Sequence, residues 1–147
     1  MDSKVILEKA VIELGKILSH LKQASFYETE PIPKSSQNNF LNTAVSGFYR
    51  GSPQTLLSRI NSIEANFGRD RSREQRWGER SLDIDILLFG NLVISEPDLV
   101  IPHPRLEERR FALEPLLELR PGARVPKTGI RYRNICINLP DQGVTKL

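Results

Sequence analysis

The stretch RWGERSLDIDILLFG, residues 76–90, decides the fold, because it combines the pattern of a buried strand with two acidic side chains. Apolar residues alternate with Asp83 and Asp85, which predicts a β-strand over residues 82–89. Side chains two positions apart in a strand point to the same face. We therefore expect a core face made of Leu82, Ile84, Ile86 and Leu88, and an opposite face made of Asp83, Asp85, Leu87 and Phe89.

The two carboxylates on one strand face suggest a metal site. Residues i and i+2 of a strand place their Cβ atoms about 6.5–7 Å apart, so two unpaired carboxylates there would repel each other. Mg²⁺ removes that repulsion, and it is typically held by one or two carboxylates together with substrate phosphates. The alternative is that Asp83 and Asp85 form the solvent face of an edge strand.

Arginine is concentrated just before this strand. The chain has 14 Arg and 7 Lys, and five of the Arg lie within residues 69–80. Arg105, Arg109 and Arg110 follow later. Because Arg is the preferred side chain for bidentate phosphate contacts, a nucleotide or a nucleic acid is a plausible partner. The alternative is a solvated basic loop, since acidic residues are interspersed in the run.

The composition is that of a single cytoplasmic domain. The 147 residues are enough for one core, and the apolar and charged fractions, 39% and 27%, are ordinary for globular proteins. We expect no membrane span and no signal peptide, because no apolar run is long enough. One Cys excludes an internal disulfide, and one Cys with two His provides too few ligands for a typical zinc site.

The element order predicts an α+β or α/β sandwich. A helix is expected from a cap at Asp2 or Ser3 to about His20, and a second from the Ser52 cap and Pro53 to Gly68. Strands are expected at 23–29, 40–50 and 82–89, a turn with short extended pieces at 90–102, and one or two short helices within 103–119, with Pro115 near a helix start. The segment from residue 121 predicts a loop-rich tail.

Two further groups are candidate ligand contacts. His103 lies between two Pro residues in a rigid turn, where it can contact a phosphate or be an ordinary surface residue. Phe40 and Asn42 share one strand face, an arrangement that suits a flat heterocycle stacked on the ring and hydrogen-bonded along one edge. The alternative is a core Phe beside a satisfied buried Asn.

RWGERSLDIDILLFG followed by IPHPRLEERRFALEPLLEL resembles the signature of the 6-hydroxymethyl-7,8-dihydropterin pyrophosphokinases of folate biosynthesis. SFYETEP and FLNTAV resemble the family's earlier strand and pterin loop, and the likeness runs from about residue 3 to 125. The resemblance implies a ferredoxin-like α/β/α sandwich around an antiparallel or mixed sheet. It also implies a Mg-dependent diphosphotransferase that moves pyrophosphate from ATP to the pterin hydroxymethyl group and releases AMP.

The resemblance assigns roles residue by residue. It implies two Mg²⁺ ions on Asp83 and Asp85, and a pterin held between Phe40 and Phe111 with Asn42, Thr29 and Ile32. It implies ATP and catalytic-loop contacts from Glu64, Arg69, Arg71, Trp77, Arg80, His103 and Arg109, of which Arg69, Arg71 and Arg80 act with the two Asp in catalysis.

The chain departs from the family at its start. The family begins with a central strand and a Gly-Ser-Asn turn, whereas this chain enters at Met1-Asp2-Ser3. We therefore expect residues 1–147 to be a single domain that lacks the family's first strand. Three or four lost core side chains at about 1.5–3 kcal/mol each would rival the whole stability of a typical domain, about 5–15 kcal/mol, and would leave neighbouring strand edges unpaired.

The expected partners are small molecules, ATP and the hydroxymethyl dihydropterin, and we expect a monomer that binds neither nucleic acid nor a membrane. Two alternatives remain: a truncated, inactive relative, and a small basic nucleic-acid-binding domain that uses the Arg-rich segment as a phosphate clamp. Asp83 and Asp85 disfavour the second, because they would repel a nucleic-acid backbone.

Overall fold

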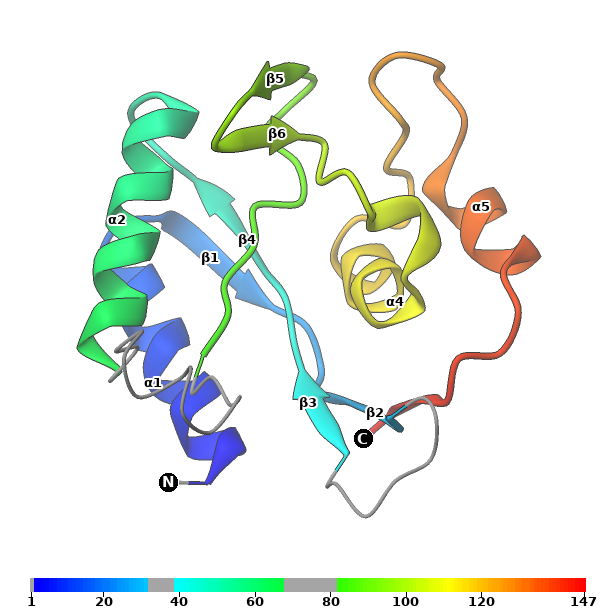
Figure 1. Ribbon diagram of the computed structural model, residues 1–147, viewed down its shortest axis with the longest axis horizontal. Helices are drawn as coiled ribbons and strands as arrows, with labels where there is room; N and C mark the ends of the chain where they lie inside the picture. Colours follow the sequence, from blue (N-terminus) through cyan, green and yellow to red (C-terminus); the bar gives the residue numbers. More distant parts are fainter. Residues whose placement is uncertain (1, 32–38, 68–81) are drawn as a thin grey trace.

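The computed structural model of the protein describes residues 2–31, 39–67 and 82–147 (Figure 1). Within these ranges it is an α+β fold whose strand pairs are all antiparallel. Helices α1 (Ser3–Gly15) and α2 (Pro53–Asn66) lie on one side of the strand pair β1 (Ser19–Gln23) and β4 (Val45–Phe48). Helices α4 (Arg110–Leu119) and α5 (Tyr132–Asn138) lie on the other side (Figure 1).

Helix α1 begins as the sequence predicts and ends earlier. The Asp2 carboxylate accepts a hydrogen bond from the Lys4 N–H at 3.2 Å, which is an N-cap. The prediction that the helix continues to about His20 was wrong, because the chain leaves the helix after Gly15 and forms β1. Pairing of β1 with β4 supplies backbone partners that outweigh the helical spacing of the apolar residues there.

The expected strand over residues 40–50 is two strands in different sheets. β3 (Phe40–Asn42) and β2 (Tyr27–Thr29) pair, whereas β4 pairs with β1. At the break between them, the Thr43 hydroxyl donates toward the carbonyls of Ala24 and Ser25, each at 3.1 Å. This side-chain contact redirects the chain from one sheet to the other.

Helix α2 follows its sequence signals closely. The Ser52 hydroxyl accepts a hydrogen bond from the Thr55 N–H at 3.2 Å, and Pro53 occupies the first turn. Of the apolar stripe that the helical spacing predicts, Leu56, Ile60 and Ile63 are buried, whereas Phe67 is half-buried. Together with α1 it covers one face of the β1–β4 pair.

The segment 82–89 is extended but is not a strand of any sheet among the described residues. Leu82 is buried and packs with Ile84 and Ile86 in the first core cluster, as the alternation predicts. Leu87 and Leu88 pack in the second cluster instead, so the predicted faces were wrong beyond Ile86. The strand prediction was wrong because no neighbouring strand in the described ranges pairs with this backbone.

Residues 90–102 form the expected turn and short extended pieces, a hairpin of β5 (Ile94–Glu96) and β6 (Leu99–Ile101). A short 3-10 helix η1 (Leu106–Glu108) and α4 follow. Pro115 lies inside α4 rather than near its start, so that prediction was wrong. Its ring nitrogen has no hydrogen to donate to the carbonyl of Phe111, and its side chain is fully buried.

The tail is more ordered than its loop-rich sequence predicts. α5 packs on α4, and β7 (Val144–Lys146) pairs with β2, so that β2 is the central strand of the order β3-β2-β7. Two clusters form the core, one between α1, α2 and residues 82–86, and one around α4 and α5. Within the described ranges, no helix is both long and apolar enough to span a bilayer.

Candidate functional site

The two acidic residues of the opening stretch lie on the exposed side of the extended segment 82–89. Asp83 and Asp85 are exposed. Leu82, which precedes Asp83, is buried, and Ile84, between the two Asp residues, is half-buried. The alternation therefore holds over the part of the segment that carries the carboxylates. Both carboxylates are therefore accessible to solvent, as a two-carboxylate cation site requires.

A buried carboxylate fixes the position of these exposed ones. Glu64 of α2 is only 4% exposed, and its Oε2 accepts a hydrogen bond from the Ile84 N–H at 2.8 Å. Because Ile84 lies between Asp83 and Asp85, this bond ties the acidic pair to a rigid helix. Glu64 thus contacts the chain itself, and its contact with ATP stays a prediction.

His103 lies beside the acidic pair. The Nε2 atom of its ring is 3.7 Å from Oδ2 of Asp85, and the Nδ1 atom accepts a hydrogen bond from the Arg105 N–H at 3.2 Å. The main-chain N–H of His103 donates to the Leu87 carbonyl at 3.0 Å. Because Nδ1 accepts a hydrogen bond, the neutral ring carries its proton on Nε2, on the side of Asp85. The fold therefore brings together two residues that the sequence had placed in separate motifs.

A second group of candidate residues lies on the β2–β3 pair. Thr29 is buried and faces Phe40 in the strand register, and its hydroxyl accepts a hydrogen bond from Asn42 Nδ2 at 3.1 Å. Phe40 is 56% exposed, so the alternative that it is a core residue was wrong. An exposed ring next to an ordered amide suits a planar heterocyclic ligand.

A third group lies where α4 begins. Arg109 precedes the helix, Phe111 is in its first turn, and the Arg109 guanidinium carbon is 5.3 Å from the centre of the Phe111 ring. This is a cation–π contact. It holds a positive charge against the ring that the family resemblance assigns to the pterin.

Five of the predicted site residues lie outside the described ranges: Ile32, Arg69, Arg71, Trp77 and Arg80. Their roles stay predictions. Among the described residues, no group of three or more His, Cys, Asp or Glu side chains forms a metal cluster. Mg²⁺ commonly takes its remaining ligands from substrate phosphates and water.

Sequence reasoning missed the contacts that hold these groups together. Arg110 was a candidate phosphate ligand, but its guanidinium donates to main-chain carbonyls of the tail. Glu118 accepts hydrogen bonds from Ser25 and from the Tyr27 hydroxyl at 2.8 Å, and these bonds hold its pKa below the ordinary value. Burial and this carboxylate raise the pKa of Tyr27. No short-range signal marks such partners, because they are distant along the chain.

Comparison with known proteins adds the chemistry that the geometry leaves open. The family model described as 7,8-dihydro-6-hydroxymethylpterin-pyrophosphokinase (HPPK) matches residues 1–121. A 2-amino-4-hydroxy-6-hydroxymethyldihydropteridine pyrophosphokinase of Bacillus subtilis (strain 168) is 41% identical over 120 residues, which are 80% of this chain and 71% of that protein.

Enzymes of the same name from other bacteria are similar. The one from Haemophilus influenzae (strain ATCC 51907 / DSM 11121 / KW20 / Rd) is 37% identical over 123 residues, 83% of this chain and 74% of that protein. The one from Aquifex aeolicus (strain VF5) is 38% identical over 118 residues, 80% of this chain and 72% of that protein. These matches define the class as the pyrophosphokinases. Within it, the chain belongs to the 7,8-dihydro-6-hydroxymethylpterin-pyrophosphokinase (HPPK) family.

Proposed function

We propose that the chain transfers pyrophosphate from ATP to 6-hydroxymethyl-7,8-dihydropterin in folate biosynthesis, releasing AMP. The pterin hydroxyl oxygen attacks the β-phosphorus, the bond from that phosphorus to the α–β bridging oxygen breaks, and AMP leaves with that oxygen. Family membership supports the reaction. The observation that carries the assignment to these residues is the approach of His103 to Asp85, two positions from the exposed Asp83.

In this proposal Asp83 and Asp85 hold two Mg²⁺ ions. The donor set fits, because both carboxylates are exposed on the same segment and Mg²⁺ binds one or two carboxylates together with phosphates. When bound, such ions supply neutralising charge for the phosphates and lower the pKa of the attacking hydroxyl. Glu64 acts indirectly, since its bond to the Ile84 N–H keeps both Asp residues in place.

The pterin is proposed to lie between the rings of Phe40 and Phe111. Asn42 bonds the edge of the heterocycle, and Thr29 orients the Asn42 amide through the bond at 3.1 Å. Correct placement of the hydroxyl converts the reaction into an effectively intramolecular one, which is the main source of rate in this class of transfer. Ile32 is proposed as a further pterin contact.

Positive charge for the phosphates is proposed to come from Arg109, Arg69, Arg71 and Arg80, with His103 as a further phosphate contact. Trp77 is proposed to pack against the nucleotide or the Arg-rich segment. His103 and Arg109 reach the site from the same connection between β6 and α4. Preorganised cationic donors stabilise charge that develops on the transferring group. The Arg109–Phe111 contact links these residues to the proposed pterin site.

For the fold, we propose the ferredoxin-like α/β/α sandwich that the family resemblance implies, with residues 82–89 pairing with a further strand. The support is the backbone of residues 82–89, which is extended but belongs to no sheet among the described residues. Extended backbone at a strand edge is suited to pair with another strand.

Purified chain incubated with ATP, Mg²⁺ and the hydroxymethyl dihydropterin tests the proposal, with nucleotide products separated by chromatography. We expect AMP in amounts equal to the pyrophosphorylated pterin, and none when pterin or Mg²⁺ is omitted. A chain that forms no AMP under these conditions is the inactive relative. Release of ADP instead would refute transfer of pyrophosphate. We expect the active form to be a monomeric cytoplasmic protein.

A further inference from the structure

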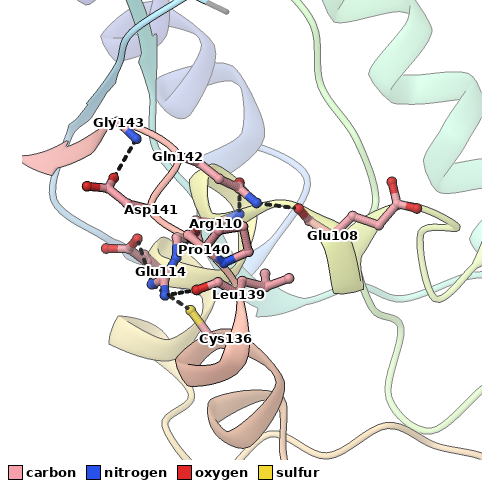
Figure 2. Close-up of polar contacts among 9 residues, drawn as sticks. All are labelled: Glu108, Arg110, Glu114, Cys136, Leu139, Pro140, Asp141, Gln142 and Gly143. Atoms are coloured by element: carbon pink, nitrogen blue, oxygen red, sulfur yellow. Dashed lines mark hydrogen bonds and ion pairs between the residues drawn. The ribbon is translucent and has the colours of Figure 1, made fainter.

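The tail of the chain is joined to the start of α4 by a set of tertiary hydrogen bonds, drawn in Figure 2. The Gln142 side chain makes two of them: its Oε1 accepts the Arg110 N–H at 2.9 Å, and its Nε2 donates to the Glu108 carbonyl at 2.9 Å. Arg109, at the N-cap position of α4, provides no side-chain cap. Gln142 therefore caps this helix from a distant part of the chain.

Arg110 makes the complementary contacts to the tail. Its Nε donates to the Pro140 carbonyl at 2.7 Å, and one terminal nitrogen donates to the Leu139 carbonyl at 2.6 Å. The other terminal nitrogen lies 3.7 Å from the Cys136 sulfur and 3.7 Å from Oε2 of Glu114. A planar guanidinium with several fixed donors is well suited to hold two successive carbonyls. We call the contacts of Arg110 and Gln142 the tail latch.

Beyond the latch, the tail becomes a strand of the sheet that carries candidate pterin residues. The Glu30 N–H donates to the Gly143 carbonyl at 3.1 Å, and β7 then pairs with β2, placing Val144 opposite Thr29. The pairing continues to Leu147, whose N–H donates to the Phe26 carbonyl at 2.9 Å. β2 is thus held on both edges, by β7 on one and by β3 on the other.

The tail latch therefore connects two parts of the fold that carry candidate pterin residues, which we call the two walls of the pterin site. One is the first turn of α4, which bears Phe111 directly after Arg110. The other is the β2–β3 pair, which bears Thr29, Phe40 and Asn42. Gln142 and β7 both lie beyond residue 121, where the family match ends.

We propose that Arg110 and Gln142 are positioning residues that set the separation of these two walls, so that a pterin ring fits between Phe40 and Phe111. This role rests on the proposed function. The two residues touch main-chain atoms of the protein and act on the ligand only through the residues they hold. The residues near the phosphates depend less on the latch, since Glu64 and the Leu87 carbonyl hold Asp85 and His103 in place.

Gln142→Ala tests the role, because it removes both hydrogen bonds of a side chain that is not in the core. Equilibrium titration with the hydroxymethyl dihydropterin, in the presence of Mg²⁺ and a non-hydrolysable ATP analogue, measures the pterin Kd. We expect that Kd to rise about tenfold, the size of one or two lost hydrogen bonds, while the analogue's Kd changes by less than about threefold. Gln142→Glu keeps the acceptor for the Arg110 N–H and should restore part of the loss.

Three controls separate positioning from general loosening. Gln54→Ala removes a Gln amide that bonds Glu96 on the surface at 3.2 Å, and it should leave both Kd values unchanged. Arg124→Lys alters a guanidinium that bonds the Gly129 carbonyl in the same tail but outside the latch, and it should leave both Kd values unchanged. Ile60→Val lowers the melting temperature through the first core cluster and should leave the pterin Kd unchanged.

The expected exchange pattern is faster amide exchange at Glu30 and Leu147 in Gln142→Ala than in the unaltered chain. An unchanged pterin Kd in Gln142→Ala would refute the positioning role of the tail latch and leave the proposed function standing. The latch would also be refuted if Ile60→Val weakened pterin binding as much. An unaltered chain that binds the analogue but no pterin would refute the proposed function and this role together.

Discussion

Nε2 of His103 lies 3.7 Å from Oδ2 of Asp85, and a separate hydrogen bond from the His103 N–H to the Leu87 carbonyl fixes this approach. The two side chains come from motifs that are separate along the sequence. Their proximity joins a carboxylate suited to a cation with an imidazole suited to a phosphate, which agrees with the proposed transfer from a Mg–nucleotide complex.

Asp85→Asn should reduce Mg²⁺-dependent AMP release by at least about 100-fold, the loss expected when a main source of charge stabilisation is removed. The amide keeps the size of the side chain but has no negative charge for a cation. Steady-state assays of AMP formation give the measurement. Asp98→Asn, in the exposed β5–β6 turn, is the matched control and should retain full activity. Retained activity in Asp85→Asn would reject the metal role.

Glu64→Ala should destabilise the protein by about 1–3 kcal/mol, because the Ile84 N–H loses its partner in a partly buried position. Chemical denaturation monitored by circular dichroism measures the change. Glu64→Gln keeps an acceptor oxygen and should lose less. Activity should fall in Glu64→Ala as well, since the Asp pair loses its anchor. Equal stability of the Ala variant and the unaltered chain would show that this bond holds nothing in place.

The contact of Glu118 with Ser25 and Tyr27 predicts a dependence of stability on pH. These hydrogen bonds lower the pKa of Glu118 in the folded state below the unfolded value, about 4.3. A lowered pKa contributes stability that is present above the unfolded value and is lost as the pH falls through the folded value. Glu118→Gln should therefore lower the melting temperature at pH 7 and make its decline below about pH 4.3 shallower.

Thermal melts across pH 3 to pH 7 test this, at roughly half-unit steps around the carboxylate range. Glu8→Gln removes the same charge from an exposed position of α1 and should change the pH profile little. A pH profile of Glu118→Gln that runs parallel to that of the unaltered chain would rule out the Glu118 contribution.

An added N-terminal strand ending in Gly-Ser-Asn before α1 should raise the melting temperature by many degrees. The added strand would pair with residues 82–89 and bury apolar surface at about 25 cal/mol per Å². Scanning calorimetry of the extended chain measures the gain. An extension of the same length and composition in scrambled order is the control. Equal melting temperatures for the two extensions would show that residues 82–89 need no strand partner.

Local signals in the sequence predicted those elements whose partners are near in the chain. Asp2 and Ser52 cap helices as expected, and the apolar stripe of α2 is buried, because capping and helical spacing are short-range properties. The end of α1 and the split at Thr43 were not predictable, since strand pairing across the sheet decides them. The contacts of Glu118 and Gln142 were missed because their partners are distant along the chain.

The site was predictable in part. The alternation around Asp83 and Asp85 predicted that both side chains lie away from the core, and both are exposed. Phe40 is exposed as well. The same alternation misplaced Leu88 and Phe89, because residues 82–89 switch from one core cluster to the other. The anchoring of the Asp pair by Glu64 depends on the approach of α2, which no local pattern encodes.

A crystal structure of the chain with Mg²⁺ and a non-hydrolysable ATP analogue tests the central claim most directly, by locating the cations. The account predicts Mg²⁺ at about 2.0–2.1 Å from carboxylate oxygens of both Asp83 and Asp85, with analogue phosphates completing the coordination. Nucleotide bound with both carboxylates turned away from it, and no cation between them, would contradict the account.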